Sequence, residues 1–221
     1  MRIGQDSIPY VYSLHVPVHL VAHPVAQDAL LALRDATTRP SHFRRLAHRL
    51  SLVVTLDATR DLTTEASTVN GPLGPAPGDR VAADVVVVPV VRAGLGMLDS
   101  VLELLPQARV GYIGLQRDEH TAIASQYYSK LPPINAGTTV LLTDPMLATG
   151  GSAVAAANII AAAGARDIRL LCVVAAPEGI AALEAAHPAI RIFTPVVDRG
   201  LNAQKFILPG LGDFGDRLYG T

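Results

Sequence analysis

Residues 139–152 read Thr139-Val-Leu-Leu-Thr-Asp-Pro-Met-Leu-Ala-Thr-Gly-Gly-Ser152 and form the most informative segment of the chain. The first four residues are typical of a short buried strand, and Asp144 follows near its end. Pro145 keeps Asp144 out of the helical conformation, so a helix can begin only near the two glycines. Glycines and a helix N-terminus bring backbone N–H groups close to an anion. The segment therefore predicts an acid followed by a phosphate-binding turn.

This turn differs from two common nucleotide-binding loops. It lacks the lysine and the spacing of a Walker A loop, and it lacks the three spaced glycines of a dinucleotide-binding fold. A carboxylate that accepts from two hydroxyls, beside amides that hold a phosphate, suits a phosphorylated sugar. The alternative is an Asx-type turn, capped by Thr149 and Ser152, before an ordinary helix.

Strands and helices alternate on both sides of the turn. Apolar runs predict strands at residues 85–91, 110–115, 139–142, 168–174 and 190–197. Helical patterns lie between them, at residues 98–105, 153–163 and 178–186. The alternation indicates an α/β fold with a central, mainly parallel sheet flanked by helices. Ligands bind beyond the carboxyl ends of such strands, so residues 92–97, 116–117 and 144–152 are expected to converge on one crevice.

We expect residues 1–221 to form one domain. It is expected to comprise an N-terminal extension (1–20), N-terminal helices and a loop (21–80), an α/β core (84–198) with a polar flap (116–138), and a C-terminal tail (199–221). Residues 70–80 contain three glycines and three prolines and are expected to form a loop. The glycine-rich tail is expected to lack regular structure.

Composition excludes several classes of protein. The chain has 221 residues, of which 50% are hydrophobic and 17% charged, so it can bury a large core instead of remaining disordered. A net charge of −1 argues against a non-specific nucleic-acid binder. No apolar stretch is long enough for a membrane span, and the N-terminus is a poor signal peptide. The single Cys172 suits a reducing compartment, so we expect a cytoplasmic protein without membrane or nucleic-acid partners.

The motif at 139–152 resembles the phosphoribosyl-diphosphate-binding signature of the type I phosphoribosyltransferases, and in particular that of the uracil phosphoribosyltransferases. Pro145 stands where the wider superfamily has a second acid, as in the uracil group. Further segments resemble blocks of that family in the same order: Arg92–Met97, Val173–Leu183, Gly200–Asn202 and Pro209–Asp216. The resemblance covers the chain from about residue 21 to its end. It implies the type I phosphoribosyltransferase fold, with a flexible flap and a small base-binding hood.

The same resemblance implies a pentosyltransferase of pyrimidine salvage, which converts uracil and 5-phospho-α-D-ribose 1-diphosphate to UMP and diphosphate. It implies phosphoribosyl-diphosphate contacts at Arg92, Arg117, Asp144, Pro145, Met146, Leu147, Ala148, Thr149, Gly150, Gly151, Ser152 and Asp213. Uracil contacts are implied at Ile207, Gly212, Asp213 and Phe214. Mg²⁺ is the implied cofactor, held mainly through the diphosphate.

The two arginines also have a rationale in their own chemistry. Arg92 follows the valine-rich strand and precedes a Gly-x-Gly turn, and a planar guanidinium matches phosphate oxygens. The alternatives are that Arg92 caps a strand end and that Arg117 is a surface residue paired with Asp118 and Glu119. Arg92 is expected to be catalytic, because it would neutralise the leaving diphosphate.

The glycine-rich loop at 207–214 suits recognition of a pyrimidine. Uracil offers two acceptors with a donor between them, and exposed main chain can supply the matching edge. Phe214 is expected to be tolerated because the backbone would read the base. Asp213 is a second catalytic candidate, either for removing the N1 proton or for holding the metal. Its alternative role is a loop-stabilising Asx turn.

Other features leave several interpretations open. The basic residues Arg44, Arg45, His48 and Arg49 are most simply a solvated helix face, with a subunit contact or a phosphate-binding patch as the alternative. GTP is considered as an activator, and a homodimer or homotetramer is expected from the resemblance. The rival functions are a phosphoribosyltransferase for another base, an RNA-binding regulator on the same fold, and a ligand sensor without turnover.

Overall fold

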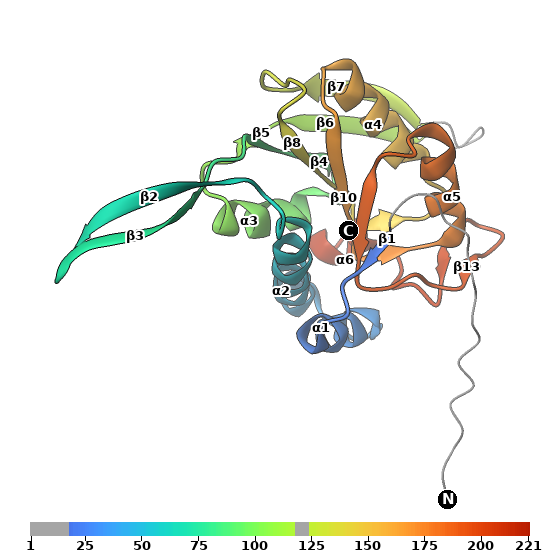
Figure 1. Cartoon of the computed structure of the whole chain (residues 1–221). Helices are drawn as coiled ribbons and strands as arrows, with labels where there is room; N and C mark the ends of the chain where they lie inside the picture. The colour runs from blue at the N-terminus through green and yellow to red at the C-terminus, as the bar shows by residue number, and fades with distance from the viewer. Residues whose placement is uncertain (1–17, 118–123) are drawn as a thin grey trace, which may run out of the picture.

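The computed structural model describes residues 18–117 and 124–221. Its central sheet has the strand order β1-β12-β10-β8-β4-β6-β7, with β5 paired to β4 (Figure 1). Every pairing is parallel except that of β6 with β7 at one edge. The strands are β1 (Val18–Leu20), β4 (Val85–Val91), β5 (Arg109–Val110), β6 (Tyr112–Arg117), β7 (Ala124–Lys130), β8 (Thr139–Thr143), β10 (Asp167–Leu171) and β12 (Arg191–Thr194). The predicted α/β class is confirmed.

Helices cover both faces of this sheet. One core packs α1 (Pro24–Arg34), α2 (Pro40–Ala58), α3 (Leu95–Leu104) and α6 (Phe214–Tyr219) against one face. The other core packs α4 (Gly151–Ala162) and α5 (Pro177–Ala186) against the opposite face. Strand β4 is valine throughout except for Pro89, because alternate residues serve different cores: Val85 and Val87 the first, and Val86 and Val88 the second.

Residues 70–80 do not form the predicted loop. They belong to a long antiparallel hairpin of β2 (Thr64–Gly71) and β3 (Gly74–Val81), which projects from the body (Figure 1). We call this hairpin the arm. In a two-stranded ribbon, each strand has one outer edge with no neighbouring strand. A proline whose nitrogen faces that edge removes no hydrogen bond between the strands. Pro75 and Pro77 lie two residues apart in β3, so their nitrogen atoms face the same edge.

The prediction of an irregular tail was also wrong. Residues 199–221 contain a short antiparallel pair, β13 (Gly200–Leu201) with β14 (Ile207–Leu208), and the helix α6. Helix α6 spans only 6 residues, too few for a periodic pattern to stand out in the sequence. One further small pair, β9 (Met146–Leu147) with β11 (Val174–Ala175), lies at the carboxyl side of the sheet.

Parts of the predicted N-terminal extension and of the predicted flap form strands. Residues 18–20 of the predicted N-terminal extension form β1, which pairs with β12, whereas residues 1–17 lie outside the described part. Within the predicted flap, residues 124–130 form β7, antiparallel to β6. The middle of the flap, residues 118–123, lies outside the described residues.

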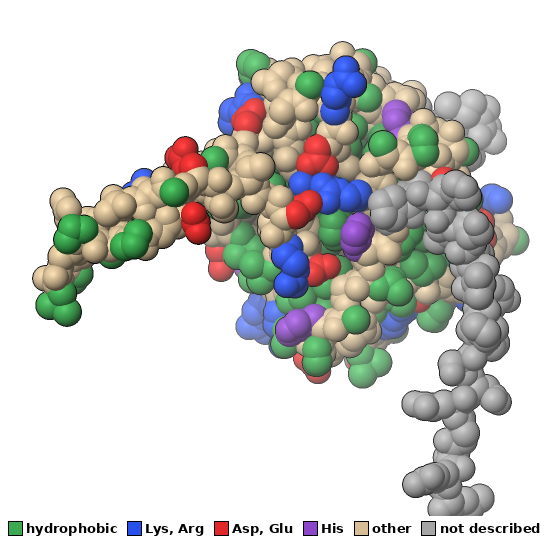
Figure 2. All heavy atoms as spheres, viewed as in Figure 1, with side chains coloured by type: hydrophobic (Ala, Val, Ile, Leu, Met, Phe, Trp, Pro, Cys, Tyr) green, Lys and Arg blue, Asp and Glu red, His purple; other side chains and the backbone are tan. Residues whose placement is uncertain are grey.

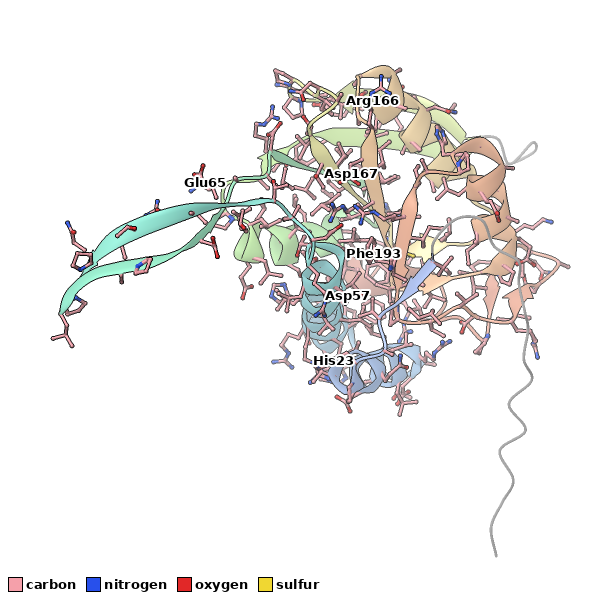
Figure 3. The ribbon with its side chains drawn as sticks, viewed as in Figure 1. His23, Asp57, Glu65, Arg166, Asp167 and Phe193 are labelled. Carbon is pink, nitrogen blue, oxygen red and sulfur yellow. The ribbon has the colours of Figure 1, made fainter. Side chains whose placement is uncertain are left out.

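A network of ion pairs joins the amino ends of β10 and β12 to the end of α2. Arg169 is buried, and its guanidinium donates to the carbonyl of Ala58 at 2.6 Å and to the carboxylate of Asp167 at 2.7 Å. Arg169 and Arg191 also pair with Asp61, and Arg191 pairs with Asp167. Figure 2 shows basic and acidic side chains gathered in the middle of this face, and Figure 3 labels Asp167 in that region.

Burial opposes ionisation of Asp167, but hydrogen bonds from Arg169 and Arg191 outweigh it and lower the pKa of that carboxyl. The network is therefore ionised at neutral pH and fastens the sheet to α2 at the end opposite the predicted ligand crevice. None of the helices in the described part has both the length and the apolarity to cross a bilayer.

Candidate functional site

The predicted phosphate-binding turn connects β8 to α4. Asp144 donates its backbone N–H to the Leu171 carbonyl at 3.2 Å, and its Oδ1 lies 3.5 Å from the backbone nitrogen of Met146. Gly150 is the N-cap of α4 and has a φ of 82°, so the chain turns sharply just before the helix. The turn encloses a hollow of about 30 Å³, which is lined by Asp144, Met146, Leu147, Ala148, Thr149, Gly150, Gly151, Ser152 and Ala153.

Pro145 does not line this hollow, although the resemblance implies that it contacts the ligand. Its carbonyl accepts hydrogen bonds from the backbone nitrogens of Val173 and Val174, at 2.9 and 3.1 Å. These bonds tie the turn to the segment that follows β10. Within this structure Pro145 therefore anchors the turn from behind.

The predicted base-binding residues line a larger cavity of about 260 Å³. Ile207, Gly212, Asp213 and Phe214 all contribute to its wall. Met146 and Ala148 line both this cavity and the hollow at the turn, so the two predicted substrate sites adjoin. The structure thus brings together segments that lie about sixty residues apart in the chain.

Asp213 caps a helix and also lines the larger cavity. Its Oδ1 accepts from the backbone N–H of Asp216 at 2.9 Å and thereby caps α6, while the residue also lines the larger cavity. The Asx-type interaction is therefore present and does not remove the carboxylate from the site. Phe214 is 1% exposed, and its ring packs edge-on against Phe43 at 5.2 Å, which holds α6 in the core.

Arg92 lies just after β4 and lines neither the hollow nor the larger cavity, although its neighbour Ala93 lines the larger cavity. Its half-exposed guanidinium pairs with Asp216 at 3.2 Å, and its carbonyl accepts from the Tyr219 hydroxyl at 3.3 Å. Arg92 does not cap its own strand, because its side chain reaches α6. An ion pair this exposed contributes at most about 1 kcal/mol, so a phosphate group can replace the carboxylate.

Close packing explains the glycines that follow Arg92. A Cβ atom on Gly94 would lie 2.2 Å from the Thr143 carbonyl oxygen, and one on Gly96 would lie 2.6 Å from a methyl carbon of Leu218. These glycines therefore let the turn after β4 pack against β8 and α6.

Arg117 is the last residue of β6, and its backbone pairs with Ala124 of β7. Its side chain lies outside the described structure. Because β4, β6 and β8 are parallel neighbours, their carboxyl ends meet at one edge of the sheet. The segments that begin at Arg92, Arg117 and Asp144 therefore share this edge of the sheet.

Sequence reasoning missed several residues of the larger cavity. Gln204, Lys205 and Phe206 line it from the turn between β13 and β14. The side-chain oxygen of Asn202 accepts from the backbone nitrogens of Gln204 and Phe206, at 3.0 and 2.9 Å, and so shapes this turn. In the sequence, only Asn202 indicated a turn at this place, since asparagine favours such turns.

The basic cluster on α2 is a solvated face, as predicted, because Arg44, Arg45 and Arg49 are exposed, although several of its side chains also contact neighbouring elements. Arg44 donates to the Leu218 carbonyl at 2.7 Å, and Arg49 pairs with Asp28. His48 contacts Glu103 at 2.9 Å and the buried hydroxyl of Ser100 at 3.0 Å. Ser100, His48 and Glu103 are thus connected in the order of a hydrolase triad. The Ser100 hydroxyl is buried, so it is inaccessible to a substrate and instead joins α3 to α2.

Comparisons with known proteins show the family of this chain. The family model described as Uracil phosphoribosyltransferase matches residues 20–221. The uracil phosphoribosyltransferase of Dictyoglomus thermophilum is 47% identical over 205 residues, which cover 92% of this chain and 99% of that protein. The enzyme of the same name from Acinetobacter baylyi is 42% identical over 207 residues, covering 93% and 98%.

Solved structures show the same relationship. The AQ2163 protein of Aquifex aeolicus superposes with a TM-score of 0.88 at 33% identity and covers 92% of this chain and 98% of that chain. A hypoxanthine-guanine phosphoribosyltransferase from Bacillus anthracis gives a TM-score of 0.51 at 9% identity, over 72% and 80% of the two chains. At that identity the likeness concerns the fold alone.

Proposed function

The chain belongs to the uracil phosphoribosyltransferase family and is a pentosyltransferase, and we propose that the turn at 144–152 and the loop at 207–214 bind its two substrates side by side. The reaction converts uracil and 5-phospho-α-D-ribose 1-diphosphate to UMP and diphosphate. The single observation that carries this assignment of sites is the shared wall at Met146 and Ala148, where the hollow and the larger cavity meet.

The 5-phosphate end of the phosphoribosyl group would bind at the hollow. Backbone N–H groups at the start of α4 and the hydroxyls of Thr149 and Ser152 would bind the 5-phosphate, helped by the helix dipole. The carboxylate of Asp144 would accept hydrogen bonds from the ribose hydroxyls. Arg92 and Arg117 would bind the diphosphate and neutralise the charge that grows on it as it leaves.

Uracil would occupy the larger cavity. Main-chain groups at Ile207, Gly212 and Phe214 would match its carbonyl and N–H groups, and the buried ring of Phe214 would leave that residue's backbone to face the base. Cytosine carries an amine in place of one carbonyl, so it would place two donors opposite each other. A mismatch of this kind costs a factor of about 10⁴ in selectivity.

With both substrates in place, N1 of uracil would attack the anomeric carbon as the bond to diphosphate breaks. Alignment of the two reactants and exclusion of water would supply most of the catalysis. Asp213 lines the cavity and is our candidate for accepting the N1 proton or for holding the metal.

The donor set of the site fits Mg²⁺. This ion prefers oxygen ligands, keeps several waters and binds proteins through one or two carboxylates together with substrate phosphates. Asp144 and Asp213 are carboxylates at the two adjoining sites. The described residues contain no cluster of three or more His, Cys, Asp or Glu side chains suited to a metal, so these carboxylates would act together with the diphosphate. When bound, the ion neutralises charge on the diphosphate.

We also propose that the protein is a homodimer or a homotetramer. The arm supports this, because an isolated two-stranded hairpin is at best marginally stable in water. Nearly all of its residues are exposed, including Leu73 at its tip, and Figure 2 shows hydrophobic side chains there. A partner chain would cover this surface. The mass in solution, measured by light scattering, tests the proposal, and a monomer would contradict it.

Regulation by GTP and a cytoplasmic location remain proposals as well. A diphosphate-release assay with and without GTP tests the first. The second is supported by the lone cysteine, Cys172, which is buried and suits a reducing compartment.

The assignment of substrate is tested by measuring diphosphate release with uracil, cytosine, orotate and hypoxanthine. We expect release with uracil alone. Preference for another base would instead favour the rival transferase. Binding of uracil without turnover would favour a ligand sensor, and salt-sensitive RNA binding would favour an RNA-binding regulator.

A further inference from the structure

A buried ion pair lies behind the loop at 207–214. Arg34 is the last residue of α1, and Asp198 follows β12. The guanidinium binds the carboxylate through two hydrogen bonds, from Nη2 to Oδ1 at 2.7 Å and from Nη1 to Oδ2 at 2.8 Å. The Asp198 side chain is only 4% exposed, so water contributes little to its solvation.

Both partners of this pair also bind the backbone of Gly210. The Gly210 N–H donates to Asp198 Oδ2 at 2.9 Å, and Arg34 Nη1 donates to the Gly210 carbonyl oxygen at 2.8 Å. Four hydrogen bonds therefore connect the two side chains and one glycine. The two polar backbone groups of that glycine are both held by charged partners, whose hydrogen bonds are stronger than neutral ones.

Gly210 lies in the turn that shapes the wall of the larger cavity. It has a φ of 58°, and a Cβ atom at this position would lie 2.1 Å from the Ile207 carbonyl oxygen. Ile207 and Gly212, on the two sides of this turn, both line the cavity. The ion pair thus holds the middle of a tight turn whose flanking residues face the proposed uracil site.

A second arginine holds the adjoining residue from the same side. Arg217 of α6 donates to the Leu211 carbonyl at 2.7 Å, and it also donates to the carbonyls of Leu33 and Asp35 at the end of α1. Consecutive residues of the loop are therefore tied to α1, one through Arg34 and the other through Arg217. This placement makes the end of α1 the support of the loop.

Stability alone does not account for a charged pair at this position. Replacement of a buried ion pair by apolar residues of similar volume is often neutral or stabilising, because the charges lose their hydration. Apolar side chains would leave the two polar groups of Gly210 without partners. The charges are therefore best explained by their hold on the loop backbone.

We propose that Arg34 and Asp198 are positioning residues for base recognition, which set the geometry of the main chain that binds uracil. The inference rests on the proposed role of the 207–214 loop. Recognition by rigid backbone groups is sensitive to small displacements. Loosening the turn should therefore weaken binding of uracil and lower the selectivity for uracil over other bases. Binding of phosphoribosyl diphosphate should change little, since the turn at 144–152 is held by other contacts.

The test compares Asp198→Asn and Arg34→Lys with the wild-type enzyme in steady-state kinetics. Asn keeps the size of the side chain but loses its charge, and Lys keeps the charge but cannot make the paired hydrogen bonds. We expect KM for uracil to rise about tenfold in either variant, as loss of roughly one hydrogen bond to a charged group predicts. KM for phosphoribosyl diphosphate should stay within about twofold, and the ratio of cytosine to uracil use should increase.

Asp167→Asn provides the matched control. It weakens another Asp–Arg pairing, with Arg169 and Arg191, at the opposite end of the sheet. We expect it to lower Tm without changing KM for uracil. The inference fails if the loop variants raise both KM values equally, change kcat alone, or behave like the control. It also fails if Arg34→Lys folds and has wild-type kinetics.

Failure of the inference can be distinguished from failure of the proposed function. A wild-type enzyme that releases no diphosphate with uracil would contradict the function itself. An active wild-type enzyme whose uracil KM is insensitive to both substitutions would contradict only the positioning role.

Discussion

A Cβ atom on Gly150 would lie 2.8 Å from the carbonyl oxygen of Gly179. The packing is reciprocal, since a Cβ atom on Gly179 would lie 2.6 Å from the carbonyl oxygen of Ala148. The turn at 144–152, which we propose binds phosphate, therefore packs against the first turn of α5, with no room for a side chain on either glycine. The shape of the hollow at this turn depends on this contact as well as on the sequence of the turn.

We predict that Gly150→Ala destabilises the protein by about 1–3 kcal/mol and weakens binding of phosphoribosyl diphosphate. Both the positive φ and the overlap with Gly179 oppose a side chain at this position. Thermal unfolding and KM for phosphoribosyl diphosphate measure the two effects. Gly151→Ala is the control for stability, because its Cβ would meet nothing closer than Thr149 Oγ1 at 3.8 Å. Equal Tm values for the two variants would contradict the prediction.

Arg92→Ala should abolish most activity while the protein stays folded. The ion pair with Asp216 is half exposed, so its loss should change the free energy of unfolding by less than about 1 kcal/mol. Kinetics with varied phosphoribosyl diphosphate, together with thermal unfolding, test this expectation. Full activity in the variant would refute a role for Arg92 in binding the diphosphate.

Two substitutions at Asp213 separate its capping role from its role in the cavity. Asn retains a side-chain oxygen that can cap α6, whereas Ala removes it at a cost of about 1 kcal/mol. We expect both Asp213→Asn and Asp213→Ala to lose activity, and only the second to lose stability. An active Asp213→Asn enzyme would show that the charge is not needed.

Acid should destabilise the wild-type protein more than Asp167→Asn. The pKa of Asp167 is lowered in the folded state, so its contribution to stability is complete above the unfolded pKa of about 3.9. That contribution disappears as the pH falls from there through the folded-state pKa. Urea unfolding between pH 6 and about 3 measures the difference, and parallel curves for the two proteins would contradict it.

Cys172 should be unreactive in the folded protein. It is fully buried, and burial raises the pKa of its thiol to about 12, so almost no thiolate forms near pH 8. A colorimetric thiol reagent should detect one thiol only after denaturation. Rapid labelling of the native protein would show that the strand β10 and its continuation open readily.

The parts of the site that were predictable from the sequence are local. Asp144, the two glycines after Thr149 and the loop at 207–214 each carry chemistry in consecutive residues, and the structure places them in two adjoining sites. The order of strands and helices was predictable for the same reason, since a covered parallel strand such as β4 is apolar along its whole length. The short helix α6 and the proline-containing arm lack such a continuous apolar pattern, so the sequence did not predict them.

The sequence by itself determined the α/β class, the turn at 144–152 and the loop at 207–214, because each depends on neighbouring residues that form a periodic pattern or a motif. Only the tertiary structure decided which distant partners support them: Gly179 behind Gly150, Asp216 beside Arg92, and Arg34 with Asp198 behind Gly210. Such contacts join segments up to 176 residues apart. These contacts depend on how the helices pack against the sheet. The residues next to a buried charge in the sequence do not indicate which distant residue pairs with it.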